Sequence, residues 1–362
     1  MMILAALTPG VRMSQWEKVG TFQRELQPYY NYVSRGAHIT FLQTAPGTAP
    51  NLPESMSIQR LPHWRFLKFW EIASSTLRRK TSVIRTNQTN RSDLFVRLGQ
   101  NWQKPVVIRG GYIYGEYRES IDGLTPQVRK IQRLEAWAFQ NATLIQLPTP
   151  QLAEWAVAHY RTDPTKIRIV PNFVDTMVFK PTKSHDAPVT MVISVGRLSA
   201  EKRFDLILRG CSLIGGVQVK IAGEGEERDR LKLVSQELNI PLVLPGNIPN
   251  DALPDFLNSG DIFMLTSLRE GHPKALIEAM SCGLPCVCLR SPGIENIIQH
   301  ETNGLLADDE QSLADALRKL MSNVELRAYL GKNAREYVIE HFDLRAVLNL
   351  DAGVIEEAVS SN

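Results

Sequence analysis

Residues 269–280 read REGHPKALIEAM, a sequence that predicts a loop leading into a helix. Pro273 suits the first position of that helix, because its missing N–H would be unpaired there in any case. Gly283 suits the turn just beyond the helix, where a left-handed residue closes the last turn. Glu270 is then predicted in the loop, and Glu278 about a turn and a half inside the helix.

The amides of Gly271, His272 and Lys274 come at the start of this predicted helix. The positive end of the helix dipole makes such amides suited to oxygen-rich or anionic ligands. With Glu270 beside them and Glu278 farther along, the stretch fits a binding site for a sugar phosphate and a ribose. It fits equally an ordinary capped helix with a surface glutamate, so the neighbouring sequence has to decide.

The second half of the chain alternates short apolar segments with helical patterns. Strands are predicted at residues 189–195, 217–222, 242–244, 261–265, 285–289 and 305–307, and helices at about 202–212, 225–239, 251–258, 273–282, 293–299 and 311–322. Continuously apolar strands in such an alternation indicate a parallel sheet covered by helices on both faces. Ligands of such sheets bind beyond the carboxyl ends of the strands, where the loop of Glu270 falls.

The first half is less regular but similar in kind. Its predicted strands are residues 3–7, 39–43, 83–86, 106–109, 144–147 and 167–170. A proline-rich boundary follows, from Pro171–Asp175 to Pro188. We therefore predict an α/β protein with two doubly wound domains, at residues 1–175 and 176–342. Residues 343–362 are predicted as a C-terminal helix that crosses back to the first domain.

The composition is that of a globular protein with room for two domains: of 362 residues, 43% are apolar and 22% are charged. No run of 18 apolar residues occurs, so the sequence predicts no membrane-spanning helix. Met1–Leu7 lacks a basic leader and is ended early by Pro9-Gly10, which predicts a buried strand and not a signal peptide. The protein is therefore expected in the cytoplasm.

Three of the four cysteines lie close together in the sequence. The four are Cys211, Cys282, Cys286 and Cys288. No histidine or carboxylate set accompanies them at zinc spacing, so no metal site is predicted. They are expected to be small buried hydrophobic residues in a reducing compartment.

Net charge is distributed unevenly along the chain. Residues 1–180 contain 23 Lys and Arg against 12 Asp and Glu, a net charge of +11, whereas residues 181–362 have 18 against 26, a net charge of −8. The basic half predicts an anionic partner, such as a membrane surface, a lipid phosphate or a nucleic acid.

Aromatic and basic residues interleave at residues 61–70, which read LPHWRFLKFW, and Arg78, Arg79 and Lys80 follow. The pattern fits an interfacial helix at the inner face of an anionic membrane. It fits nucleic acid less well, because no binding module of that kind surrounds it, and no nucleic-acid partner is predicted. A membrane contact through residues 61–80 is one expectation; a core-facing aromatic stripe with a solvated basic edge is the alternative.

Residues 195–202 run from a predicted strand end through a loop into a helix. Gly196 allows close approach of the backbone, while Arg197 and Lys202 bring two cations to the mouth of the sheet. Together they fit a diphosphate whose charge grows as it departs. Two solvated surface cations are the alternative.

A further loop follows the strand at 242–244. It contains Asn247 and Ile248, whose backbone is placed to contact the edge of a nucleobase. An ordinary turn explains the same residues, and the sequence does not choose between the two.

Taken together, these stretches resemble the retaining family 4 glycosyltransferases, which have the GT-B fold of two Rossmann-like domains facing across a cleft. The resemblance extends over about residues 167–342. The matching residues are Pro171–Asp175, Gly196-Arg197, Glu201-Lys202, Ser267–Gly271, Pro273, Glu278–Met280, Gly283–Pro285, Gly293 and Asn303–Leu305. Several motifs in the family's order are far more specific than any one alone.

The resemblance implies that residues 1–175 bind the acceptor and residues 176–342 bind the nucleotide-sugar donor. It implies that Arg197 and Lys202 hold the donor diphosphate and that Glu278 binds the ribose. It also implies that Glu270, with the amides of residues 271–274, holds the donor sugar. Members of the family transfer sugar with retention of configuration and usually without a metal.

The first domain matches the family less well. The family's loop after the first strand carries paired glycines, and only Gly10 can be matched to it here. Many relatives place a histidine after a middle strand, where this chain has Arg109-Gly110-Gly111-Tyr112. Arg109 and Tyr112 are therefore candidates for contacting the acceptor, with mere packing as an equal alternative.

The sequence thus predicts a cytoplasmic retaining glycosyltransferase of the hexosyltransferase class, EC 2.4. It would move a sugar from a UDP- or GDP-linked donor to a saccharide or lipid-linked saccharide acceptor, in the synthesis of cell-surface polysaccharide or glycolipid, without a cofactor or a metal. The alternatives are a phosphorylase or nucleotide-sugar epimerase on the same scaffold, and a nucleotide-sugar binding protein without turnover.

Overall fold

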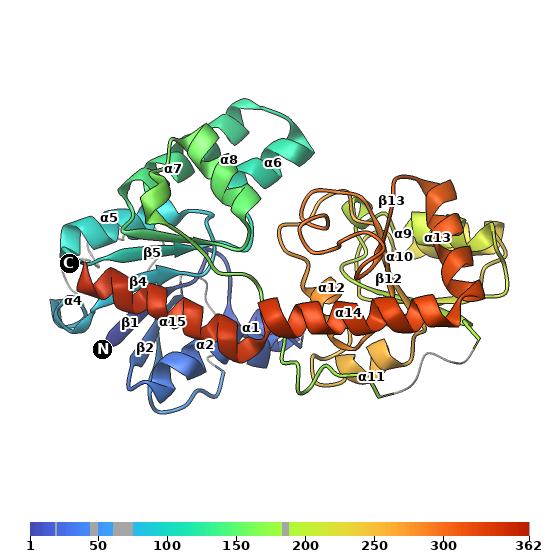
Figure 1. The fold of residues 1–362 in the computed structure, drawn as a ribbon. Coiled ribbons are helices and arrows are strands. Elements are labelled where there is room, and N and C mark those ends of the chain that lie inside the picture. The colour runs from blue at the N-terminus through green and yellow to red at the C-terminus, as the bar shows by residue number, and fades with distance from the viewer. Residues whose placement is uncertain (19, 44–49, 61–74, 183–187, 362) are drawn as a thin grey trace. The chain divides into compact units, whose positions relative to one another are not determined.

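The computed structural model describes residues 1–18, 20–43, 50–60, 75–182 and 188–361. These residues form two compact units (Figure 1). The first unit comprises residues 1–171 and 348–362, and the second comprises residues 172–347. Each unit is built on its own parallel sheet with helices between the strands, so the predicted α/β class with two doubly wound domains is confirmed.

The first unit contains a seven-stranded parallel sheet in the order β3-β2-β1-β4-β5-β6-β7. The strands are β1 (Met2–Ala6), β2 (His38–Gln43), β3 (Met56–Arg60), β4 (Val83–Thr86), β5 (Val106–Arg109), β6 (Leu144–Leu147) and β7 (Ile167–Ile169). All but β3 were predicted, to within one residue at each end. The strand order reverses between β1 and β4, which makes the carboxyl ends of these two strands the switch point of the sheet.

Helices cover both faces of this sheet. They are α1 (Met13–Lys18), α2 (Phe22–Ser34), α4 (Ser75–Lys80), α5 (Ser92–Trp102), α6 (Tyr114–Asp122), α7 (Pro126–Asn141), α8 (Pro150–Tyr160) and α15 (Leu344–Ser360). Figure 1 shows α5, α7 and α8 on one side of the strands and α2 and α15 on the other. The C-terminal segment therefore belongs to the first unit from Leu348 onward.

A buried ion pair fastens α15 to the sheet. The guanidinium of Arg85 on β4 is 3.0 Å from Asp351 Oδ1, and both side chains are almost wholly buried. Gln146 donates to the same carboxylate at 2.9 Å, and the Tyr32 hydroxyl donates to its other oxygen. Burial alone would raise the pKa of Asp351, but Arg85, the Tyr32 hydrogen bond and Arg109 outweigh it and hold that pKa below its ordinary value.

The second unit contains a six-stranded parallel sheet in the order β10-β9-β8-β11-β12-β13. The strands are β8 (Met191–Val195), β9 (Gln218–Ala222), β10 (Leu242–Gly246), β11 (Ile262–Leu265), β12 (Cys286–Leu289) and β13 (Leu305–Ala307). The helices are α9 (Phe204–Ser212), α10 (Arg228–Glu237), α11 (Leu253–Asn258), α12 (Lys274–Ser281), α13 (Glu310–Ser322) and α14 (Val324–Phe342). All six strands were predicted to within two residues.

Alternate residues of the central strands enter two separate cores. On β11, Ile262 and Met264 pack into one core, whereas Phe263 and Leu265 pack into the other. This is the two-faced burial that continuously apolar strands predict. The four cysteines are buried within the same unit and carry free thiols, as expected for small hydrophobic residues.

Some predicted details of the second unit are wrong. Residues 293–299 form a series of turns and not a helix, because Gly293 has φ = +86° and only isolated hydrogen bonds follow it. Ile294, Ile297 and Ile298 are all buried, so their helix-like spacing reflects core packing. Pro273 precedes the first helical residue, with ψ = 105°, and α12 starts at Lys274.

The boundaries between the units differ slightly from the predicted ones. The division falls after Pro171 and after Val347, whereas the sequence predicted it after Asp175 and Phe342. The Val174 amide donates to the Phe342 carbonyl at 3.0 Å, so this stretch is held within the second unit.

The predicted membrane-contact segment at 61–80 is described only in part. Residues 61–74, with the interleaved aromatic residues, lie outside the described residues. Arg78, Arg79 and Lys80 are exposed in the last turn of α4. Among the described helices, none combines the length and the apolar character needed to cross a bilayer.

Candidate functional site

Two loops of the second unit leave the sheet at its switch point. The strand order reverses between β8 and β11, which are paired neighbours. The loop at residues 196–202 follows β8, and the loop at residues 266–273 follows β11. The two motifs that the sequence singled out therefore begin side by side at the carboxyl edge of the sheet, where ligands of parallel α/β sheets bind.

The first of these loops is packed closely against the end of β9. The Gly196 amide donates to the Ala222 carbonyl at 2.9 Å, and the Leu198 amide donates to the Glu224 carbonyl at 2.9 Å. Gly223 has φ = +143°, and a Cβ atom there would come within 1.9 Å of the Gly196 carbonyl oxygen. The backbone course that carries Arg197 is thus fixed by a glycine that no other residue can replace without a shift.

The two loops are joined to each other through the backbone. The Leu268 amide donates to the Glu201 carbonyl at 2.9 Å. The buried hydroxyl of Thr266 lies 3.0 Å from the Lys202 carbonyl and 2.9 Å from the Arg203 carbonyl, so it can donate to either. Arg203 has φ = +47°, and Thr266 steadies this uncommon conformation. The sequence alone gives no sign of this role for Thr266, because its partners lie more than 60 residues away.

Lys202 and Glu270 form an ion pair across these loops. The ammonium nitrogen is 2.6 Å from Glu270 Oε1, and the side chains are 20% and 13% exposed. An ammonium group has three N–H donors, so Lys202 can hold Glu270 and still donate to an anionic ligand. The structure brings these two predicted site residues together.

Arg197 lies in the same loop and is exposed. Within the part of the chain that the structure describes, its guanidinium forms no ion pair. Its five N–H donors therefore remain available for an anionic ligand.

The backbone of Glu270 depends on a second close glycine. The Glu270 amide donates to the Pro292 carbonyl at 3.0 Å. Gly293 has φ = +86°, and a Cβ atom there would come within 2.0 Å of the Glu270 carbonyl oxygen. The turn after β12 thus fixes the position of the Glu270 main chain.

The segment between Glu270 and α12 is held from a distant part of the chain. Asn172 donates through Nδ2 to the His272 carbonyl at 2.7 Å. The His272 ring packs edge-on against Phe342, with ring centroids 4.7 Å apart. Burial, aided by the charge of Lys274, lowers the pKa of His272 to about 3, so this imidazole is neutral at pH 7. Gly271 lies half-buried between Glu270 and this anchored residue.

Several buried polar atoms of this region have no hydrogen-bond partner among the described residues. They are Ser267 Oγ, His272 Nδ1 and Ser291 Oγ. Ser267 precedes Glu270 in one loop, and Ser291 precedes the turn of Gly293. Unsatisfied buried groups are uncommon and concentrate where a ligand or an ordered water completes them.

Glu278 lies in the second turn of α12, as predicted, and is 3% exposed. Gly283 follows the helix with φ = +73°, which confirms its predicted role in closing α12. A glutamate is rarely buried to this degree unless its carboxylate has partners.

Asn247 and Ile248 follow the end of β10, which is separated from β8 by β9. Asn247 is exposed, while Ile248 is partly buried against one of the two cores. Both lie at the same edge of the sheet as the loops of Lys202 and Glu270. Their strand, β10, is two strands away from β8, which leads into the Lys202 loop.

In the first unit, the predicted residues also lie at the carboxyl edge of the sheet. Gly10 has φ = +90° in the turn after β1, and the preceding Thr8 amide donates to Asn87 Oδ1 at 2.7 Å. Arg109 ends β5 and is half-buried, and the Tyr112 ring packs against Tyr117 with centroids 5.2 Å apart. Thr8 and Asn87 thus close the switch point of this sheet, and Arg109 lies one strand beyond it.

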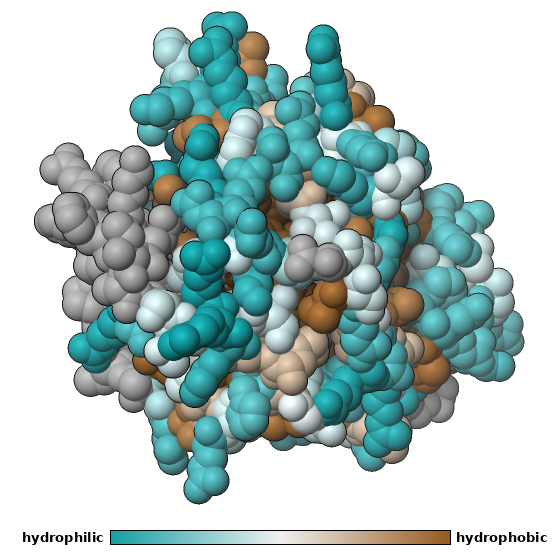
Figure 2. All heavy atoms as spheres, turned by 90° about the vertical axis from the view of Figure 1, so that its left-hand side faces the viewer, coloured by the Kyte–Doolittle hydropathy of each residue, from teal (hydrophilic) through white to brown (hydrophobic). Residues whose placement is uncertain are grey.

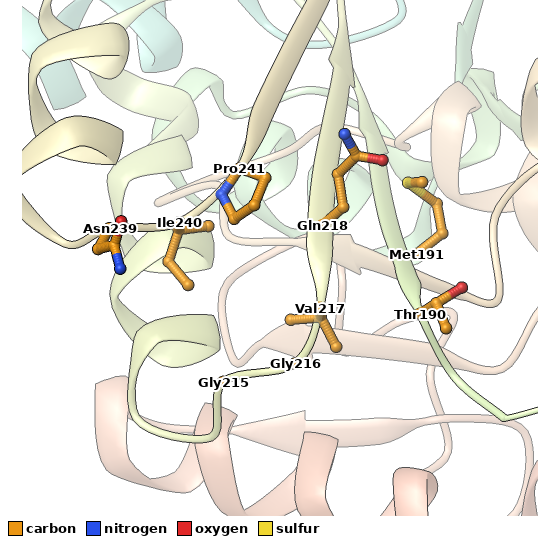
Figure 3. A pocket seen from close by; sticks show the side chains of 9 residues that line it. All are labelled: Thr190, Met191, Gly215, Gly216, Val217, Gln218, Asn239, Ile240 and Pro241. Carbon is orange, nitrogen blue, oxygen red and sulfur yellow. The ribbon is translucent and has the colours of Figure 1, made fainter.

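A surface cavity of about 510 Å³ lies at the opposite edge of the second sheet (Figure 3). It is formed around the amino ends of β8 and β9, where Thr190, Gly216 and Gln218 are among the lining residues. None of the predicted site residues lines it. The cavity is therefore distinct from the loops that carry Lys202 and Glu270.

The second unit is similar in sequence to known glycosyltransferases. Residues 178–337 match the family model described as glycosyl transferases group 1. This range contains both loops and the whole sheet of the second unit. The fold is also that of solved glycosyltransferases: the structure of Anabaena Alr3699/HepE in complex with UDP aligns with a TM-score of 0.81 and 17% identity, over 99% of this chain and 100% of that chain.

Two curated relatives show the same likeness in sequence. The chain is 27% identical over 222 residues to the lipopolysaccharide core biosynthesis glycosyltransferase LpsE of Rhizobium meliloti (strain 1021), covering 58% of this chain and 63% of that protein. It is 30% identical over 235 residues to the UDP-Gal:alpha-D-GlcNAc-diphosphoundecaprenol alpha-1,3-galactosyltransferase of Escherichia coli, covering 58% and 59%. The chain thus spans about three fifths of the length of these relatives. It is homologous to glycosyltransferases and has the GT-B fold that the sequence predicted.

Proposed function

We propose that the protein is a retaining glycosyltransferase of family 4 that uses a nucleotide-sugar donor. The second unit would bind the donor, and the first unit would bind the acceptor. The observation that carries the proposal is the Lys202–Glu270 pair, in which a cation and an acid from two strand-end loops meet 2.6 Å apart at the switch point.

Charge supports this assignment of the donor diphosphate. Arg197 is exposed in the loop that ends with Lys202, so two cations are available in one short segment. Together they would offset the charge that develops on the departing diphosphate, which is the part a metal ion takes in other transferases. We therefore propose a metal-independent reaction without a cofactor.

The remaining donor contacts follow from the same edge of the sheet. Glu270 and the amides of Gly271, His272 and Lys274 would hold the sugar, while Pro273 directs the chain into α12. Glu278 would accept the ribose hydroxyls. Hydrogen bonds from a hydroxyl to a carboxylate are among the stronger neutral-to-charged contacts.

Backbone groups of four further residues are proposed to contact or approach the donor. The loop of Asn247 and Ile248 would contact the base. Gly196 and Gly10 would allow close approach of the donor, because neither presents a side chain to it.

Retention of configuration would follow from attack on the face that the diphosphate leaves. Glu270 is the carboxylate that contacts Lys202, and it is already held in that ion pair. The leaving phosphate would therefore take the proton from the acceptor hydroxyl, so that the new glycosidic bond forms as the sugar–phosphate bond breaks. Exclusion of water would protect the donor from hydrolysis.

The acceptor is proposed to be a saccharide or a lipid-linked saccharide of cell-surface polysaccharide or glycolipid synthesis. The names of the relatives above include lipopolysaccharide core biosynthesis and a diphosphoundecaprenol-linked acceptor, which supports this class. Arg109 and Tyr112 are the proposed acceptor contacts.

A lipid-linked acceptor also supports a cytoplasmic enzyme that touches the inner face of a membrane. Among the described residues, the side of the first unit that carries α4 presents mostly hydrophilic side chains, with small separate apolar patches (Figure 2). Arg78, Arg79 and Lys80 would therefore contribute electrostatic attraction to anionic lipid and not deep insertion.

A donor screen tests the proposal. The full chain is incubated with labelled UDP-glucose, UDP-galactose, UDP-N-acetylglucosamine and GDP-mannose, with and without a chelator, and nucleotide release is followed. We expect slow hydrolysis of one of these donors, unaffected by the chelator and faster when a saccharide acceptor is present. Binding without release of nucleotide would instead indicate a binding protein.

A further inference from the structure

A buried carboxylate on α7 caps the N-terminus of α6. Glu135 is 4% exposed, and its Oε1 accepts from the Tyr114 amide at 3.1 Å. Its Oε2 accepts from the Gly115 amide at 2.7 Å and from the Tyr160 hydroxyl at 2.8 Å. Tyr114 and Gly115 are the first residues of α6, where amides lack partners within their own helix. The capping group is thus supplied from another helix.

Side chains that follow β4 hold the loop that leads into α6. Thr89 Oγ1 accepts from the Tyr114 amide at 3.0 Å and donates to the Tyr112 carbonyl at 3.4 Å. Gln88 Oε1 accepts from the Gly111 amide at 3.3 Å. The residues between Arg109 and α6 are therefore tied to the neighbouring strand end before they reach Glu135.

Two glycines allow this close packing. A Cβ atom on Gly115 would come within 2.3 Å of the Tyr160 hydroxyl and 2.7 Å of Glu135 Oε2. A Cβ atom on Gly110 would come within 2.4 Å of Thr89 Cγ2. The chain from Gly110 to Gly115 is thus fixed at both ends.

We propose that Glu135 is a positioning residue that presets the loop of Arg109 and Tyr112 for the acceptor. This inference rests on the proposed role of that loop in acceptor binding. The Glu135 carboxylate already accepts from the Tyr114 and Gly115 amides. The N-terminus of α6 is therefore not a subsite for an anionic group of the acceptor. Glu135 instead holds Arg109 and Tyr112 in one arrangement, so that the acceptor binds a preformed surface.

The test is a split between acceptor and donor kinetics in the full chain. Glu135→Gln keeps the shape of the side chain but turns an amide N–H₂ toward one of the donors that the carboxylate now accepts from. With the donor found in the screen, and with n-octyl glycosides of glucose, galactose and N-acetylglucosamine as acceptors, we expect the acceptor kcat/KM to fall about 10-fold or more, mainly through KM. The donor KM and the release of nucleotide to water should stay within twofold.

Two further variants separate positioning from general stability. Thr125→Ala removes the N-cap of the same helix α7, where Thr125 Oγ1 accepts from the Val128 amide at 3.3 Å, and it should leave the acceptor KM unchanged. Thr89→Val removes the hydroxyl at the other side of the loop with little change of shape. It should reproduce the selective rise in acceptor KM to a smaller degree, and it serves if Glu135→Gln does not fold.

Each result decides between the ideas. An unchanged acceptor KM in Glu135→Gln, or an equal loss in donor and acceptor kinetics, overturns the positioning role while leaving the transferase intact. A wild-type protein that releases nucleotide from no donor, or that transfers to none of the glycosides, overturns the proposed function or the acceptor role of the loop, and this inference with it.

Discussion

The carboxyl edges of the two sheets use their charged residues in different ways. In the second unit, Arg197 is exposed, and Lys202 and Glu270 meet at the switch point while keeping partial exposure. In the first unit, two charged residues near the corresponding edge are buried and stabilise the fold: Arg85 pairs with Asp351, and Glu135 caps a helix. The second unit thus leaves these charges accessible at its sheet edge, where we propose that the donor binds, whereas the first unit uses Arg85 and Glu135 for its own structure.

This difference is consistent with the range of the family model, which lies within the second unit. Ligand-facing loops at a switch point need fixed residue types at fixed spacing, and the family model matches within residues 178–337. A structural ion pair can be replaced by other solutions, and buried pairs are often exchangeable for apolar packing. The first unit can therefore vary while keeping its sheet.

Asp351→Asn should give the largest effect, and it tests whether the buried Arg85–Asp351 pair stabilises the first unit. It leaves the buried Arg85 charge without its partner, so the free energy of unfolding should fall by about 3–5 kcal/mol in denaturant titrations. On the same helix, Glu356 pairs with Arg35 3.1 Å away at an exposed site. Glu356→Gln should cost only about 0–1 kcal/mol, and equal losses in the two variants would contradict the burial argument.

The same carboxylate predicts a pH dependence. Because the pKa of Asp351 is lower in the folded protein than in the unfolded chain, the stability it contributes is present above the ordinary Asp value of about 3.9 and is lost as the pH falls through the folded value. Acid titration of unfolding should therefore show a loss of stability below about pH 4 that Asp351→Asn lacks. An identical acid slope in both proteins would rule out this linkage.

Lys202→Ala tests the proposed role of Lys202 in the donor site of the second unit. If Lys202 offsets charge on the departing diphosphate, kcat should fall about 10²–10³-fold, or about 2.7–4 kcal/mol, with little change in melting temperature. Lys232→Ala is the matched control, because Lys232 lies on the exposed face of α10 and pairs only with the exposed Asp229 in the described structure. A loss of stability with normal turnover would assign Lys202 to structure instead.

Glu278→Ala sharpens the account of the donor site. We expect UDP or GDP to bind more weakly by about 1.5–3 kcal/mol in calorimetry, the typical worth of a hydrogen bond to a charged group. Glu278→Gln, which keeps the side-chain volume in this buried position, should lose part of that affinity. Unchanged affinity in both variants would refute the ribose role.

Charge reversal at Arg78, Arg79 and Lys80 should give the smallest effect. Each cation near an anionic surface contributes about 1 kcal/mol, so the triple variant should sediment less with liposomes that contain phosphatidylserine. Neutral liposomes provide the control. If both proteins sediment equally with anionic liposomes, the membrane contact of this segment should be abandoned.

Sequence alone predicted most of the sheet architecture, because apolar runs of four to six residues mark buried parallel strands. It missed β3, whose residues MSIQR are mostly exposed at the sheet edge and carry little apolar signal. It misread residues 293–299 because Ile294, Ile297 and Ile298 have helical spacing in a series of turns. The spacing of the isoleucines reflects their burial, whereas the positive φ of Gly293 determines that the segment forms turns and not a helix.

The candidate site residues could be singled out from the sequence where a motif carries its own signal. Such motifs contain Gly196, Arg197, Lys202, Glu270 and Glu278, in predicted strand-end loops and a predicted helix. Thr266 gives no such signal, because it acts through a backbone carbonyl more than 60 residues away. Asn172 lies in a stretch that matches the family, but only the structure shows its hydrogen bond to the His272 carbonyl. Glu135 is similar: only the fold brings α7 to the start of α6.

The central claim is that the second unit grips an activated sugar through its pyrophosphate and ribose. The most direct measurement is a crystal structure of the full chain with UDP, and with GDP as the second ligand. We expect the pyrophosphate oxygens within hydrogen-bonding distance of Arg197 and Lys202, and the ribose hydroxyls at Glu278. A nucleotide bound elsewhere, for example in the cavity at the amino ends of β8 and β9, would contradict the account.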